Sequence, residues 1–88
     1  MSEAVALLAM ADPFTRFCWE HLLAHGSAAV RELVEASGSA EWWPVKAGLE
    51  VLRRNGLAEE DRTGRWRLTE FGRRVRDVSV ELRSLPVV

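Results

Sequence analysis

The sequence VKAGLEVLRRNGL at residues 45–57, followed by GRWRLTEFGR at residues 64–73, decides how this chain folds. In the first stretch, apolar residues spaced four and three apart share one face of a helix: Val45, Leu49 and Leu52. Pro44 falls in the first turn of that helix, where a missing N–H costs little. Gly56 suits a left-handed position at its end. The stretch therefore predicts a helix that begins near Pro44 and ends before Gly56.

The second stretch changes from the period of a helix to that of a strand. Charged and apolar residues alternate over residues 65–68, so Trp66 and Leu68 should face the core, with the two arginines facing outward. Residues 57–60 are the predicted partner strand, and Gly64 ends the turn between them. Thr69 then caps a last helix, whose apolar residues follow a 4-3-4-3 spacing: Phe71, Val75, Val78, Leu82 and Leu85.

Two further helices precede these elements. Asp12 and Pro13 are a helix start, and Gly26 ends that helix. Its apolar residues occupy a wide arc, of which one side should serve the core: Phe14, Phe17, Cys18 and Leu22. We expect Ser27 to cap a second helix that Gly38 closes.

The order helix, helix, helix, hairpin, helix predicts a mainly α domain with a small β-hairpin. This is the winged helix-turn-helix plan, with a three-helix core, a two-stranded wing and a C-terminal helix. The 88 residues suit one domain, residues 1–88, and 48% apolar with 28% charged residues argue against disorder. A domain this short has thin stability, which favours assembly with a partner chain.

The residues from Val45 to Leu57 and from Gly64 to Arg73 resemble the third helix, the wing and the following helix start of MarR-like and ArsR-like winged-helix regulators. The resemblance spans about residues 27–75. It implies that the third helix reads bases in the major groove of DNA and that the wing touches the backbone or minor groove. It also implies a homodimer built from terminal helices.

The predicted function is therefore that of a DNA-binding transcriptional regulator whose partner is double-stranded DNA. A helical projection and the charges of the wing select the residues expected at the DNA: Trp43, Lys46, Glu50, Arg54, Arg62, Arg65 and Arg67. The net charge of −1 is unfavourable, but ten basic and eight acidic residues follow Gly38, against two basic and five acidic residues up to it.

A protein-protein interaction module, such as an adaptor or a subunit of a larger assembly, is the alternative. Winged helices also serve in this way. Its motivation is the pair Trp42 and Trp43, either of which could contact a protein partner, together with the near-zero net charge. The projection turns Trp42 nearer the apolar face of the helix, so we expect Trp42 in the core.

The last helix, residues 69–85, carries an apolar seam of period 3.5, which two crossing helices need. We expect it to form a homodimer together with the N-terminal segment, residues 1–11. The residues expected at the subunit contact are Trp19, Leu23, Val75, Val78, Leu82 and Leu85. The alternative is that this helix folds back onto the first helix of its own domain.

Other function classes have little support. We expect no enzyme, because the sequence has no phosphate-binding loop and no nucleophile elbow. We expect no cofactor and no metal site, since His21 and His25 are joined only by the single Cys18. We expect no secretory signal and no membrane-spanning stretch, and we expect a cytoplasmic protein, which one unpaired cysteine fits.

Overall fold

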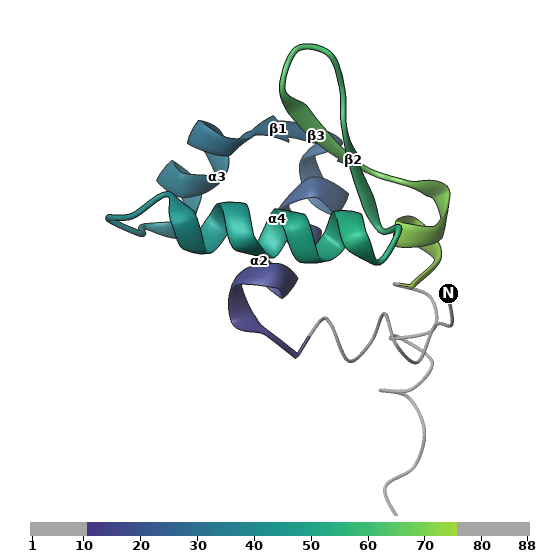
Figure 1. The fold of residues 1–88 in the computed structure, drawn as a ribbon, viewed down its shortest axis with the longest axis horizontal. Coiled ribbons are helices and arrows are strands. Elements are labelled where there is room, and N and C mark those ends of the chain that lie inside the picture. The colour runs from purple at the N-terminus through teal and green to yellow at the C-terminus, as the bar shows by residue number, and fades with distance from the viewer. Residues whose placement is uncertain (1–10, 76–88) are drawn as a thin grey trace, which may run out of the picture.

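The computed structural model describes residues 11–75, drawn in colour in Figure 1. Six elements are ordered along this part of the chain: α2 (Pro13–His25), β1 (Ser27–Ala29), α3 (Val30–Ser37), α4 (Trp43–Arg54), β2 (Ala58–Glu60) and β3 (Arg65–Leu68). Residues 70–75 begin a further helix. The expectations for residues 1–10 and for Val78, Leu82 and Leu85 lie outside the described residues. Within residues 11–75, no helix has the length and apolar character needed to cross a membrane.

The helix boundaries follow from local capping chemistry. The Asp12 carboxylate accepts hydrogen bonds from the Thr15 backbone N–H (2.8 Å) and hydroxyl (2.9 Å), and Pro13 is the first residue of α2. Gly26 ends α2 with a φ of 86°. The predicted start and end of this helix are both confirmed, because each depends on residues close in the chain.

The predicted second helix begins two residues later than expected, since its N-cap is Ala29 and not Ser27. Ser27 does not cap it: Ser27–Ala29 is a strand, and Val30 is the first residue of α3. β1 pairs antiparallel with β3, with Ala28 opposite Trp66, and the sheet order is β1-β3-β2. A three-residue strand of small residues has little strand propensity of its own, so pairing with β3 decides its conformation.

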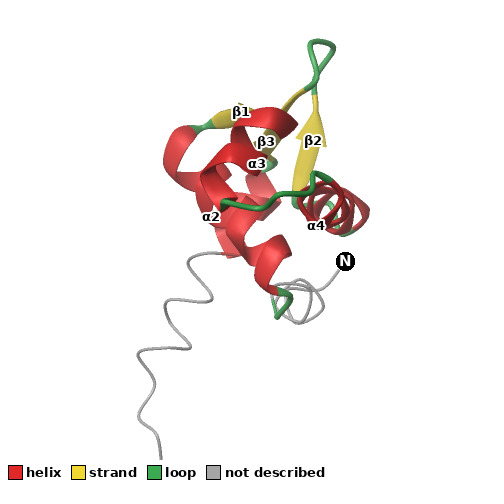
Figure 2. Ribbon diagram, turned by 90° about the vertical axis from the view of Figure 1, so that its left-hand side faces the viewer, coloured by secondary structure: helices red, strands yellow, loops and turns green. Residues whose placement is uncertain are grey.

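The β2-β3 hairpin is the predicted wing and projects beyond the helices (Figure 2). Its register places Glu59 opposite Arg67 and Glu60 opposite Trp66. β3 alternates as predicted, with Trp66 and Leu68 buried and Arg67 exposed. The three-helix arrangement with this hairpin is a winged-helix fold. Its sheet has three strands and not the predicted two, because β1 pairs with β3.

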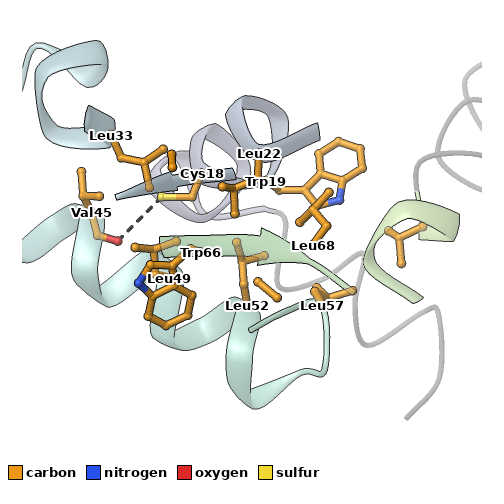
Figure 3. Packing of buried hydrophobic residues seen from close by; sticks show 13 residues of the cluster. Cys18, Trp19, Leu22, Leu33, Val45, Leu49, Leu52, Leu57, Trp66 and Leu68 are labelled. Atoms are coloured by element: carbon orange, nitrogen blue, oxygen red, sulfur yellow. Dashed lines mark hydrogen bonds between the residues drawn. The ribbon is translucent and has the colours of Figure 1, made fainter. Parts of the chain in front are cut away.

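One core joins the helices to the sheet (Figure 3). Its fully buried large side chains come from every layer: Trp66, Leu22, Leu33, Leu49, Leu52, Leu57, Val45 and Val75. α2 crosses α4 closely at Gly48, where a Cβ would lie 3.0 Å from the Phe14 carbonyl carbon. The predicted inner face of α4 and the core position of Trp66 are confirmed.

The segment 57–72 contacts α2. We call this contact the Gly72 junction and define it as Trp19, Leu57, Thr69 and Gly72. The indole N–H of Trp19 donates to the Gly72 carbonyl at 2.8 Å. A Cβ on Gly72 would lie 2.1 Å from the Leu57 carbonyl oxygen. The Thr69 hydroxyl oxygen accepts from the Gly72 N–H (3.0 Å), which confirms Thr69 as a helix cap.

Trp19 is therefore buried in its own chain, with 7% of its surface exposed. The expectation that it would meet a partner subunit is not what the structure shows, because the start of the last helix covers it. Leu23 is half-buried, and Val75 is buried within the chain.

Candidate nucleic-acid interface

The outward side of α4 is the first part of the candidate interface. We call Trp43, Ala47, Glu50 and Arg54 the α4 outer flank, because a helical projection places them on one side. Trp43 is 60% exposed, Ala47 and Arg54 are exposed, and the opposite side of the helix is buried. The sequence-based assignment of the two sides of this helix is confirmed.

Trp42 is an exception. Its side chain is 62% exposed, so the expectation that it belongs to the core is wrong. Trp42 is the N-cap residue of α4, and the buried side of the helix begins only at Val45. A projection assumes that the core extends along the whole helix, and here it ends one turn short of Trp42.

Glu50 lies in the middle of the flank and is engaged by two cations. The Lys46 ammonium lies 3.6 Å from its Oε1, and the Arg53 guanidinium hydrogen-bonds to its Oε2. The hydrogen bond from Arg53 is the main cause that lowers the pKa of Glu50. The carboxylate is therefore charged at neutral pH and partly neutralised by its neighbours, which reduces its repulsion of phosphate.

Lys46 joins α4 to the hairpin. Its Nζ lies 5.0 Å from the ring centroid of Trp66 on β3, within cation–π distance. The indole itself is fully buried. The helix and the hairpin thus share one continuous surface at this point, and the two elements are adjacent in both views (Figures 1 and 2).

The tip of the hairpin is ordered by Asp61. One carboxylate oxygen accepts from the Thr63 N–H (2.8 Å), the Thr63 hydroxyl (2.6 Å) and the Arg65 N–H (3.1 Å). The hydrogen bond from the Thr63 hydroxyl is the largest of the causes that lower the pKa of Asp61. Arg62 is exposed beside this turn and has no acidic partner within 4.0 Å among residues 11–75.

The two arginines of β3 have different surroundings. Arg67 is exposed and pairs across the strands with Glu59 at 3.3 Å. Arg65 is half-buried: its guanidinium donates to Glu32 on α3 (2.7 Å), to the Ser27 hydroxyl (3.2 Å) and to the Ser27 carbonyl (3.3 Å). The expected outward position holds for Arg67, whereas Arg65 ties the hairpin to β1 and α3.

Arg53 is a basic side chain of this face that the sequence-based selection missed. It is exposed next to Glu50 on the same helix. The signal was present in the adjacent pair Arg53 and Arg54 at the helix end, where cations also suit the helix dipole. The link between Arg65 and Glu32 had no sequence signal, since the two residues are 33 positions apart.

The side chains considered for metal or redox chemistry, His21, His25 and Cys18, all belong to α2. The His21 and His25 rings stack at 4.1 Å, and burial followed by the charge of His25 lowers the pKa of His21. No group of three candidate metal ligands occurs in residues 11–75. Cys18 is fully buried, its Sγ lies 3.7 Å from the Val45 carbonyl oxygen, and burial raises its pKa to about 12.

Comparisons with known proteins agree with the fold. No family model and no curated protein matches the chain. Among solved structures, the quinone-bound YodB from B. subtilis superposes with a TM-score of 0.77 over 92% of this chain and 90% of that chain, at 18% sequence identity. The two chains therefore share the winged-helix fold over nearly their whole lengths.

Proposed function

We propose that the protein is a DNA-binding transcriptional regulator of the MarR-like or ArsR-like kind, which inserts α4 into the major groove and lays the hairpin on the backbone. The observation that carries this proposal is the Lys46–Trp66 contact, because it makes α4 and the hairpin one surface. An α-helix fits the major groove, and a neighbouring ribbon can reach the phosphates. The shared fold with YodB is consistent with this use.

The charge of this surface supports binding to a polyanion. Residues 43–68 contain six basic and four acidic residues, although the whole chain has a net charge of −1. Arg54 and Arg62 are exposed and have no acidic partner within residues 11–75, so they are the best candidates for phosphate contacts. Arg65 is left out of the proposed contacts because Glu32 and Ser27 hold it.

The test is a salt titration of binding to mixed genomic DNA. Wild-type affinity should fall steeply as salt rises. Arg54→Ala and Arg62→Ala should each weaken binding to all sequences and reduce the slope of log K against log salt by about 1. Arg16→Ala on α2 is the matched control: its arginine is also on the surface but pairs with Glu20, so binding should not change. Undetectable binding at low salt would overturn the proposal.

The proposal includes a homodimer built from residues 1–11 and residues 69–85, with Leu23 as the contribution of α2. Two copies related by a two-fold axis would present two α4 helices to half-sites about one DNA turn apart. Solution mass decides this point: we expect twice the 9.9 kDa of one chain. We place the protein in the cytoplasm, where an unpaired cysteine stays reduced.

A protein-interaction module is the second candidate, and one observation favours it. Trp42 and Trp43 are large apolar side chains that are each about three-fifths exposed. Aromatic side chains of this kind anchor protein interfaces. If no duplex binds at low salt, the protein-interaction module becomes the preferred function. It predicts that Trp43→Ala folds normally but no longer binds the partner protein.

A further inference from the structure

The N-terminal half of the α4 outer flank is apolar. Trp43 and Ala47 lie one helical turn apart on it, and both are exposed. Trp43 shows 60% of its surface, which is unusual for a tryptophan in a small domain with a complete core. We call these two residues the apolar strip.

The polar groups next to the strip are already engaged. Glu50, one turn further along, is held by Arg53 and Lys46. The Lys46 ammonium lies over the Trp66 indole. The first half of the helix therefore offers a base pair an apolar surface rather than a ready set of hydrogen-bond donors and acceptors.

The major groove has one apolar feature that differs among base pairs, which is the C5-methyl group of thymine. Alanine and aromatic side chains make favourable contacts with that methyl group. In helix-turn-helix proteins, the N-terminal residues of the recognition helix are the ones that meet the base edges. Trp43 and Ala47 occupy those positions in α4.

We infer that the apolar strip reads thymine methyl groups, so that the DNA selected by this protein carries thymine opposite Trp43 and Ala47. This inference rests on the proposed function and adds to it the chemistry of the base that is read. It makes Trp43 a residue that determines specificity, separate from the arginines that contact phosphate.

The experiment compares thymine with uracil, which pairs identically but lacks the methyl group. Duplexes are first selected by the wild-type protein from a library with a randomised centre. One enriched duplex is then made with thymine and, separately, with uracil at single positions. Dissociation constants are measured for the wild type, Trp43→Ala and Trp42→Ala.

The wild type should bind about fourfold more weakly for each contacted methyl group that is removed. In Trp43→Ala this thymine-to-uracil ratio should fall close to one at the position that Trp43 contacts and stay at the wild-type value at a position that Ala47 contacts. Trp42→Ala is the matched control: Trp42 is equally exposed but points about 100° away around the helix, so its ratio should stay at the wild-type value. Both side chains are exposed, and thermal unfolding curves should confirm that both variants fold.

Two failures are distinguishable. If a duplex is selected but the wild type binds thymine and uracil forms equally, or if Trp43→Ala keeps the wild-type ratio at every position, the inference is wrong and the proposed function stands. If no duplex is enriched at low salt, the proposed function fails and the inference falls with it.

Discussion

The Gly72 junction and the α4 outer flank differ in whether their side chains have partners within the chain. At the junction, Trp19 donates to the Gly72 carbonyl, and Thr69 caps the following helix. On the flank, Trp43 and Arg54 are exposed to solvent, with no acid within 4.0 Å of the Arg54 guanidinium among the described residues. The side chains of the junction are thus engaged within the chain, whereas Trp43 and Arg54 on the flank are open to solvent. Substitutions at the two places should therefore affect different properties.

The largest effect is expected at Gly72. In Gly72→Ala the new Cβ would meet the Leu57 carbonyl oxygen at 2.1 Å, so the backbone must move. We expect a loss of about 3 kcal/mol or more in the free energy of unfolding, a large fraction of the total stability of a small domain. Urea unfolding followed by circular dichroism measures it.

Gly38→Ala is the control for that variant. Gly38 has a φ of 71° but nothing within 4 Å of the position of a Cβ. It should lose only about 1 kcal/mol, the cost of a left-handed alanine. Equal losses at the two glycines would show that the junction is not tightly packed.

Cys18 tests how well the core excludes solvent, because it is fully buried beside α4. Burial raises its pKa from 9.0 to about 12, so the folded protein should hold about a thousandfold less thiolate than the unfolded chain. Alkylation by a thiol reagent should be slower in the native protein by a comparable factor. Rapid native labelling, at the rate seen in urea, would contradict the burial of this thiol.

The same shift sets a pH dependence. The folded state holds the proton of the Cys18 thiol more tightly than the unfolded chain does. The stability that the protonated thiol contributes is therefore complete below pH 9 and is lost as the pH rises from 9 toward 12. Stability measured between pH 8 and about 10.5 should fall, and Cys18→Ala should make that fall shallower. A fall of the same steepness in the variant would assign it to other groups.

Trp19 in the Gly72 junction and Trp43 on the α4 outer flank allow the two regions to be compared with the same residue type. Trp19→Phe removes the donor to the Gly72 carbonyl and should cost about 1–2 kcal/mol of stability. Trp43→Phe should change stability by less than about 0.5 kcal/mol, since its side chain is exposed. Thermal unfolding of both variants measures the difference, and equal losses would remove the distinction between the two regions.

The smallest effect separates the two hairpin arginines. Arg65→Ala breaks a part-exposed ion pair with Glu32, which should cost at most about 1 kcal/mol of stability. Arg62→Ala should leave stability unchanged and lower DNA affinity. Unfolding and DNA-binding measurements on both variants should show a loss of stability in Arg65→Ala and a loss of DNA affinity in Arg62→Ala. If Arg62→Ala changed stability alone, that result would argue against a contact between the wing and DNA.

Local patterns in the sequence determined where the helices and strands of this protein end and which of their faces are buried. Asp12, Gly26, Gly56 and Thr69 lie at element ends as predicted, because capping depends on residues within a few positions. The inner face of α4 and the alternation of β3 follow from periodicity, which is also local. The winged-helix fold and most of the candidate interface therefore came from the sequence.

Tertiary structure decided what depends on residues far apart. β1 exists because β3 lies beside it, Arg65 is engaged because Glu32 and Ser27 lie within hydrogen-bond distance, and the last helix covers Trp19. Trp42 is exposed because the core ends before it. A single sequence records which residues can be buried or paired, but the partner of each is set only when the chain closes on itself.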